Sequence, residues 1–116
     1  MKTHHICVPN VATDLEYRIG SNAAENSVLI QKSSPDDLWF HLDGMASAHV
    51  LVTPPSGLSK KQKQTVIKWG ATLCKKHSRV QHDSHVSVVY TTVAHLRLTD
   101  TPGMVVLDGS EKKMVM

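Results

Sequence analysis

The sequence has few cysteines, few aromatic residues and no long apolar segment. Its 116 residues include two cysteines, two tryptophans, two tyrosines and one phenylalanine. Cys7 and Cys74 are too few for a secreted disulfide framework and too far apart for a Cys-x-x-Cys metal knuckle. We therefore expect free thiols and a cytoplasmic or nuclear protein. No stretch approaches the roughly 20 apolar residues that span a bilayer, so no membrane partner is expected.

Acidic residues are missing from the middle of the chain. Between Gly44 and His82 there is no Asp or Glu, whereas this span holds seven of the 13 Lys and Arg residues, a charge of +7. The remainder has six basic and ten acidic residues, a charge of −4, which gives the overall +3. Such asymmetry favours a polyanionic partner.

The spacing of apolar residues predicts one α+β domain over residues 1–116. We expect a mixed or antiparallel β-sheet, one long amphipathic helix and one shorter helix. Strand patterns occupy His5–Val8, Glu16–Ile19, Val86–Thr92 and His95–Leu98, and the shorter helix extends from Asn22 to about Gln31. Met104–Leu107 and Lys112–Val115 flank Asp108-Gly109, which predicts a β-hairpin between them.

A second hairpin is predicted around Asp43-Gly44, which separates two apolar runs. If Leu42 pairs with Ala48, then His41 faces His49, with Phe40 opposite Val50 and Trp39 opposite Leu51. One face is then entirely apolar and belongs to the core, with Leu38, Phe40, Leu42, Ala48, Val50 and Val52. The other face is mixed and carries Asp37, Trp39, His41, His49 and Leu51. Trp39 is either a core residue packed on Leu51 or a half-exposed platform for base stacking.

The long helix is predicted to begin at Ser59 and end near Arg79. On a helical wheel, Lys61, Lys68, Lys75 and Arg79 lie opposite the apolar stripe and form a basic ridge. No Glu is interleaved with these cations, although opposite charges four residues apart would stabilise a helix. The ridge therefore favours binding to a phosphate backbone over a merely solvated helix face.

Catalytic and metal sites find less support in the sequence. Asp37 and His41 would lie about 13 Å apart along one strand, too far for a hydrogen bond. Ser47 and His49 are a conceivable nucleophile and base, but no third orienting carboxylate is apparent. His41 and His49 would need a third ligand to hold zinc, and no histidine spacing matches a zinc motif. We expect no cofactor, no metal and no catalysis; an RNA-processing enzyme that uses His41 and His49 is the alternative.

Several short motifs occur in an order that resembles the NFACT-R family. The matching residues are Gly20, Asn22, Glu25-Asn26, Asp37 to His41, Ser47, His49, Ser78, Tyr90-Thr91 and Pro102-Gly103-x-Val105. The resemblance covers about residues 16–107. Two departures lie in the Ser-His motif, where Ala46 replaces the family's Gly and Ala48 is inserted between Ser47 and His49.

The resemblance implies an RNA-binding module without a settled catalytic activity. Larger family members act in ribosome quality control, but they carry further domains that do not fit in 116 residues, so their tRNA and tailing roles are not carried over. The expected partner is RNA, tRNA or ribosomal RNA, with the ribosome or translation factors as further candidates. A short membrane relative is associated with DNA sensing, which keeps DNA as an alternative. A third possibility is a protein-interaction adaptor whose basic helix meets an acidic partner. The chain is expected to be either a minimal stand-alone member or a piece of a longer one.

The sequence thus predicts two candidate surfaces for nucleic acid. They comprise Asp37, Trp39, His41, Ser47 and His49 on the sheet, and Lys61, Lys68, Lys75 and Arg79 on the helix.

Overall fold

The computed structural model describes residues 2–8, 11 and 14–116, which form an α+β fold as predicted. One antiparallel sheet has the strand order β1-β2-β4-β3-β5-β8. Its strands are β1 (Lys2–Ile6), β2 (Leu15–Ile19), β3 (Leu38–Leu42), β4 (Val50–Val52), β5 (Ser87–Thr92) and β8 (Lys112–Val115). A smaller sheet pairs β6 (Leu96–Leu98) with β7 (Val105–Leu107), and the helical elements are α1 (Ala23–Gln31), α2 (Lys60–Lys76) and the short η1 (Val93–His95).

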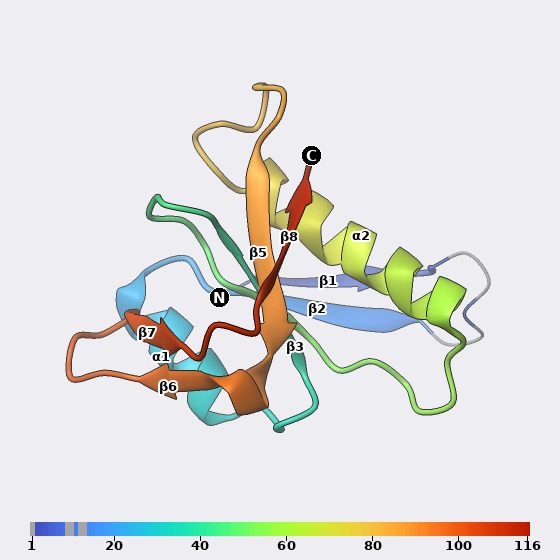
Figure 1. Cartoon of the computed structure of the whole chain (residues 1–116), viewed down its shortest axis with the longest axis horizontal. Coiled ribbons are helices and arrows are strands. Elements are labelled where there is room, and N and C mark those ends of the chain that lie inside the picture. The colour runs from blue at the N-terminus through green and yellow to red at the C-terminus, as the bar shows by residue number, and fades with distance from the viewer. Residues whose placement is uncertain (1, 9–10, 12–13) are drawn as a thin grey trace.

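The large sheet is covered on both faces, and the alternation in β3 shows why. Phe40 is fully buried toward α2, where it packs in a cluster that includes Val66 and Leu73. Trp39 points the other way, into a second cluster with Leu29 of α1 and the apolar residues of β6 and β7. Figure 1 shows α2 and the β6–β7 pair on opposite sides of β5. A strand with two buried faces explains the almost continuous apolar run of β3.

The predicted register of the hairpin across Asp43-Gly44 is confirmed where β3 pairs with β4, but β4 begins at Val50, so the ladder does not include Ala48 or His49. Trp39 pairs with Leu51 and Phe40 with Val50, and the six residues expected on the apolar face all belong to the α2-side cluster. The prediction of a hairpin across Asp108-Gly109 is wrong. There β7 pairs with β6, whereas β8 crosses to the large sheet and pairs with β5. An Asp-Gly turn motif is a local pattern. It carries no information about strands elsewhere in the sequence with which each flanking strand can pair instead.

The helix boundaries follow from their caps. Asn22 accepts a hydrogen bond from the backbone N–H of Glu25, and Ser59 forms a capping box with Gln62. Helix α2 ends at Lys76, so Arg79 lies in the following turn and not on the helix as predicted. Strand β1 starts three residues earlier than expected, and Pro9, expected to end it, lies outside the described residues. None of the described helices is long and apolar enough to cross a membrane.

Candidate nucleic-acid interface

The solvent side of α2 carries positive charge only. The helix contains six lysines and no Asp or Glu, and Lys61 and Lys68 are both exposed. At about 100° per residue these two positions differ by roughly 20°, so they share one line along the helix. Val66 and Leu73 occupy the opposite side and are buried against the sheet. The amphipathic helix predicted from the sequence is therefore present, with its cationic side facing solvent.

Trp69 belongs to the same solvent side and was missed in the prediction from the sequence. Its side chain is 37% exposed, whereas the other tryptophan, Trp39, is 2% exposed. On the helical wheel Trp69 lies about 20° from Lys76 and about 80° from Lys61. The wheel also places Trp69 about 40° from Leu73, so it lies at the edge of the apolar stripe. A large, partly exposed aromatic ring at this edge, on a helix with six lysines, was the available signal.

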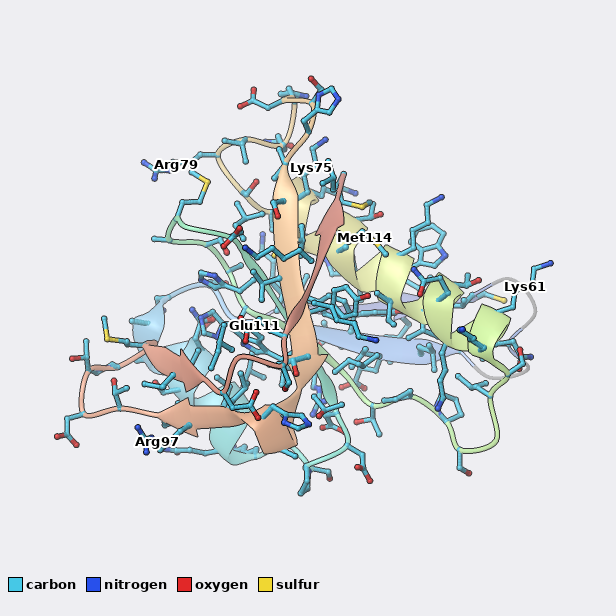
Figure 2. The ribbon with its side chains drawn as sticks, viewed as in Figure 1. Lys61, Lys75, Arg79, Arg97, Glu111 and Met114 are labelled. Atoms are coloured by element: carbon cyan, nitrogen blue, oxygen red, sulfur yellow. The ribbon has the colours of Figure 1, made fainter. Side chains whose placement is uncertain are left out.

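The two remaining members of the predicted ridge are placed differently. The amino group of Lys75 donates a hydrogen bond to the backbone carbonyl of Met116, at 3.3 Å. Arg79 is exposed in the turn after α2 and projects on the other side of β5 from Lys61 (Figure 2). Lys61 and Lys68 thus share one line along α2, with Trp69 to one side of it, whereas Arg79 lies beyond the end of the helix. From here "the α2 surface" means Lys61, Lys68, Trp69 and Lys76.

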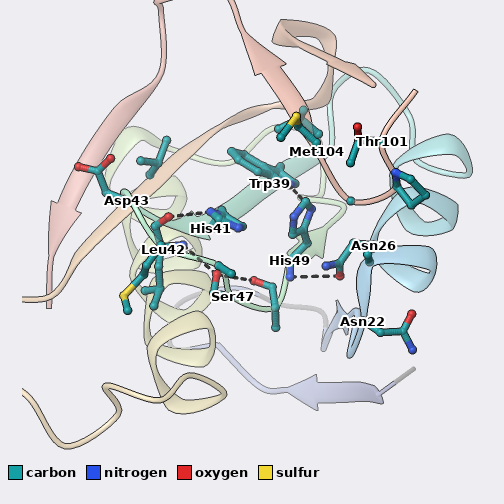
Figure 3. A pocket seen from close by; sticks show the side chains of 18 of the residues that line it. Asn22, Asn26, Trp39, His41, Leu42, Asp43, Ser47, His49, Thr101 and Met104 are labelled. Carbon is teal, nitrogen blue, oxygen red and sulfur yellow. Dashed lines mark hydrogen bonds between the residues drawn. The ribbon is translucent and has the colours of Figure 1, made fainter. Parts of the chain in front are cut away.

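An open cavity of about 860 Å³ lies on the other face of the sheet, against β3 (Figure 3). Its floor includes Trp39, His41 and His49, and the loop between β3 and β4 forms one side. The N-terminus of α1 and residues 101–104 close the opposite side. No Lys or Arg among the described residues lines this cavity, which sets it apart from the α2 surface.

Three aromatic side chains interlock at the floor of the cavity. The indole N–H of Trp39 donates to Nδ1 of His49 at 3.0 Å. The ring of His41 lies parallel to the indole at an interplanar angle of 4° and meets the His49 ring edge-on, with centroids 4.8 Å apart. The predicted proximity of His41 and His49 is therefore confirmed, and Trp39 is a core residue on which His41 stacks.

The hydrogen bonds assign the tautomer of each neutral imidazole. Nδ1 of His41 must donate to the Leu42 carbonyl, 2.6 Å away, because a carbonyl oxygen only accepts, which leaves Nε2 of His41 as a bare acceptor. Nδ1 of His49 accepts from Trp39, so its Nε2 carries the proton. Burial lowers the pKa of His49 to about 3, with the neighbouring His41 adding to the effect. Burial also lowers the pKa of His41, against the raising effect of its bond to Leu42. Both rings are uncharged at neutral pH.

Ser47 is bonded to the backbone and not to His49. Its hydroxyl donates to the Ala48 carbonyl at 3.0 Å and accepts from the backbone N–H of Leu42 at 3.1 Å. It therefore closes the loop between β3 and β4. A serine nucleophile activated by His49 finds no hydrogen bond to support it in the described part of the chain.

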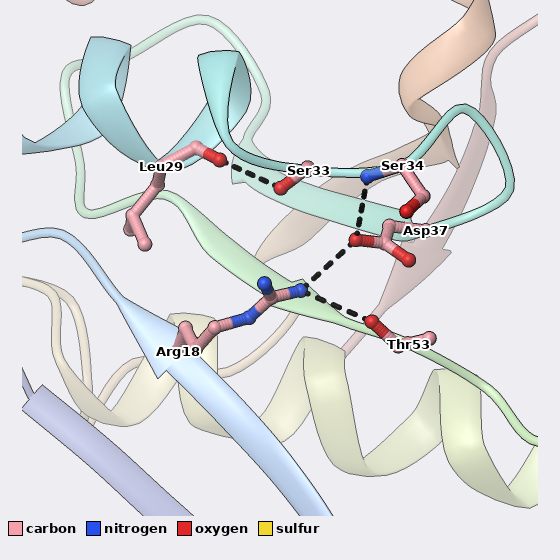
Figure 4. A network of polar contacts seen from close by, with 6 residues as sticks. All are labelled: Arg18, Leu29, Ser33, Ser34, Asp37 and Thr53. Carbon is pink, nitrogen blue, oxygen red and sulfur yellow. Dashed lines mark hydrogen bonds and ion pairs between the residues drawn. The ribbon is translucent and has the colours of Figure 1, made fainter.

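Asp37 lies outside the cavity, in a buried ion pair with Arg18 of β2 (Figure 4). The carboxylate is 2% exposed and its Oδ2 accepts from the Arg18 guanidinium at 3.1 Å and from the Ser34 backbone N–H at 3.0 Å. The Arg18 guanidinium also reaches the Thr53 hydroxyl at 3.3 Å. Asp37 thus ties β3 to β2 and to the loop that follows α1.

Gly20, Asn26 and Gly103, all members of the short motifs identified in the sequence, connect the walls of the cavity. A Cβ on Gly20 would lie 1.9 Å from Oδ1 of Asn26, and that oxygen accepts from the backbone N–H of His49 at 3.3 Å. Gly103 has φ of +78° and donates its N–H to the Ser27 hydroxyl at 2.7 Å. A Cβ there would meet the α1 backbone at 2.9 Å. Gly20 and Gly103 are thus required where the chain approaches α1 most closely.

The described residues bring together no group of three His, Cys, Asp or Glu side chains that would hold a metal ion. His41 and His49 are a pair without a third ligand among them. Cys74, whose thiol lies behind the loop between β3 and β4, is buried, and burial raises its pKa to about 12.

A cationic helix and a separate cavity lined by no Lys or Arg among the described residues fit a small nucleic-acid-binding module, and the family comparison supports this class. The chain belongs to the NFACT RNA-binding domain family, because the model of the NFACT protein RNA binding domain matches residues 12–112. The family model thus includes β2, the cavity and α2.

Curated relatives are similar to 70% of this chain. The chain is 29% identical over 83 residues to coiled-coil domain-containing protein 25 of Danio rerio and 30% identical over 83 residues to that of Mus musculus. A homolog from Dictyostelium discoideum is also 30% identical over 83 residues. Each match covers 70% of this chain and 40% of the relative, so the chain spans well under two thirds of their length.

A solved structure confirms the fold independently. The C-terminal part of the fibronectin/fibrinogen-binding protein from Streptococcus suis superposes with a TM-score of 0.75 at 25% identity. The match covers 87% of this chain and 40% of the other.

Proposed function

We propose that this domain binds RNA, either tRNA or ribosomal RNA, through the α2 surface and catalyses no reaction. One observation carries the proposal: α2 exposes Lys61, Lys68 and Lys76 together with part of the Trp69 ring, and the helix contains no carboxylate. Lysines at the start of α2 oppose the helix dipole, so helix stability does not account for them. The cytoplasm or the nucleus is the compartment that this proposal implies.

The chemistry of this surface fits a single strand. Lysines bind the phosphate backbone as point charges, and an exposed indole offers a flat face on which an unpaired base stacks. An acidic protein would satisfy the lysines but would leave the indole without a specific role. Duplex DNA would likewise use the charges and not the ring.

The experiment is a titration of the domain with tRNA, single-stranded RNA and duplex DNA at two salt concentrations. Lys61→Glu combined with Lys68→Glu should weaken RNA binding and reduce the salt slope by about one for each lysine that neutralises a phosphate in the wild type. The matched control is Lys32→Glu with Lys112→Glu, two exposed lysines on other elements that give the same change of net charge.

The two double variants distinguish the loss of a specific binding surface on α2 from a general effect of the lower net charge. RNA affinity that falls equally in both would contradict the assignment to α2. Binding to none of the three nucleic acids at low salt would refute the proposed function as a whole. Tighter binding to duplex DNA than to RNA of equal length would favour the DNA alternative.

A further inference from the structure

We propose that the cavity against β3 binds a single unpaired nucleobase, whose polar edge forms hydrogen bonds with Nε2 of His41 and Nε2 of His49. This inference deepens the proposed function and rests on it, because it assigns a second, base-recognising site to the same RNA partner. The α2 surface contacts backbone charge, whereas the cavity is suited to a group without charge.

The size and lining of the cavity point to a flat neutral ligand. Its volume of about 860 Å³ falls within the roughly 300–1,000 Å³ that is usual for small-molecule sites. Val89, Met104 and Leu107 supply apolar walls, and the described lining holds no Lys or Arg to pair with a phosphate. Asp43, at the edge, already forms an ion pair with Lys113 at 3.0 Å. An uncharged heteroaromatic ring matches this combination better than an anion does.

The two imidazoles offer one donor and one acceptor to such a ring. Nε2 of His49 carries a proton, Nε2 of His41 carries a lone pair, and neither makes a hydrogen bond within the described part of the chain. His49 lines the cavity, and its Nε2–H has no partner among the described residues and is not shut off from solvent, so it is available to a ligand there. The Watson–Crick edge of every base presents an acceptor beside a donor, which is the complement of this pair.

The surrounding contacts fix this donor–acceptor pair before any ligand arrives. Trp39 holds the His49 tautomer through its indole N–H, and the Leu42 carbonyl holds that of His41. On the far wall, the bond from the Gly103 N–H to the Ser27 hydroxyl fastens residues 101–104 to α1. Preorganised polar groups lower the cost of ordering a site on binding.

The experiment uses uncharged nucleosides, so that the lysines of α2 contribute nothing to the signal. The chain has two tryptophans, so Trp69→Phe leaves Trp39 as the only one, and its fluorescence reports on the cavity. We expect adenosine, cytidine, guanosine or uridine to give a saturable change in this fluorescence. In the wild-type protein the indole N–H signal of Trp39 and the amide of Gly103 should shift in ¹H–¹⁵N spectra during the same titration.

His41→Phe is the test variant because it keeps a flat ring on Trp39 and removes the acceptor. Loss of one hydrogen bond should weaken nucleoside binding about tenfold. The matched control is His82→Phe, which changes an exposed histidine in the turn after α2. A ¹H–¹⁵N spectrum of each variant verifies that the fold is retained.

The outcomes distinguish this inference from the proposed function. No saturable signal with any of the four nucleosides would overturn the base site, and salt-dependent RNA binding at α2 would then still stand. Equal nucleoside affinity in His41→Phe and wild type would also overturn it, because the ligand would then lie elsewhere. Nucleoside binding in a protein that binds no RNA would instead refute the proposed function.

Discussion

The indole N–H of Trp39 and Nδ1 of His49, 3.0 Å apart, form a hydrogen bond between two side chains that are each 2% exposed. The bond needs His49 to be neutral, because a protonated imidazole has donors only. The core of the domain therefore contains a group that resists protonation.

The first prediction concerns stability in acid. The pKa of His49 is about 3 in the fold and about 6.5 when unfolded, so the unfolded state binds more protons between these values. The contribution of neutral His49 to the free energy of unfolding is fully present above about pH 6.5 and is lost as the pH drops toward 3. Between pH 7 and pH 5 the loss from His49 is about 2 kcal/mol. Urea denaturation at each pH measures it.

His49→Asn keeps an acceptor for Trp39 but does not titrate, so it should lack this part of the pH dependence. His82→Asn, at an exposed position, should retain the wild-type slope. An unchanged slope in His49→Asn would show that other groups cause the acid sensitivity.

The second prediction concerns Gly70 on the buried side of α2. A Cβ there would lie 2.3 Å from the ring of Phe40, which is fully buried. Gly→Ala normally stabilises a helix by about 1 kcal/mol, but overpacking should reverse the sign and cost about 1–3 kcal/mol. Thermal or urea denaturation of Gly70→Ala tests this against Thr72→Ala, a half-exposed position on the same helix. A more stable Gly70→Ala would contradict the contact.

The third prediction concerns the ion pair of Arg18 and Asp37. Arg18→Met leaves a buried carboxylate without its cation and should cost about 3 kcal/mol of unfolding free energy. Arg97→Met, at an exposed position of β6, should change stability by less than about 0.5 kcal/mol. Because Asp37 is buried in the ion pair with Arg18, we do not expect it to contact RNA. The folded fraction of Asp37→Asn should therefore bind RNA like the wild type. Weaker RNA binding by Asp37→Asn than by the wild type, at equal concentrations of folded protein, would show that Asp37 contributes to the interface.

The fourth prediction concerns Trp69. Its replacement by Ala should weaken binding of single-stranded RNA by about 1–3 kcal/mol, the usual contribution of one stacked base. Duplex binding should change little, since paired bases are not available to stack. Trp69→Phe keeps an aromatic face and should retain part of the affinity. Equal losses for single-stranded and duplex ligands in fluorescence anisotropy would argue against stacking.

Local patterns predicted those parts of the fold that depend on alternation and caps. The period of two in β3 separated Phe40 from Trp39 correctly, and the Ser59–Gln62 spacing located the start of α2. The hairpin across Asp108-Gly109 failed because β8 finds its partner in β5, more than twenty residues away in sequence. Such non-local competition is invisible to a turn motif.

In the candidate site, too, local patterns predicted some features, whereas contacts between distant segments determined the others. The meeting of His41 and His49 followed from strand register, and the exposure of Lys61 and Lys68 from the helical period. Asp37 was assigned to a surface because its partner Arg18 lies on β2, and no short-range pattern connects the two. The cavity itself depends on residues 101–104 packing on α1, a contact that the Pro-Gly motif marked without explaining.

The large sheet has α2 on one face and the cavity on the other, so the two proposed RNA sites lie on opposite faces of the domain. A short oligonucleotide would engage one of them, whereas a longer strand that passes around the sheet edge would engage both. Linked binding raises the effective concentration at the second site, so affinity should rise in a step with RNA length and not in proportion to it. The affinity of the domain would then depend on whether the unpaired strand is long enough to reach both sites.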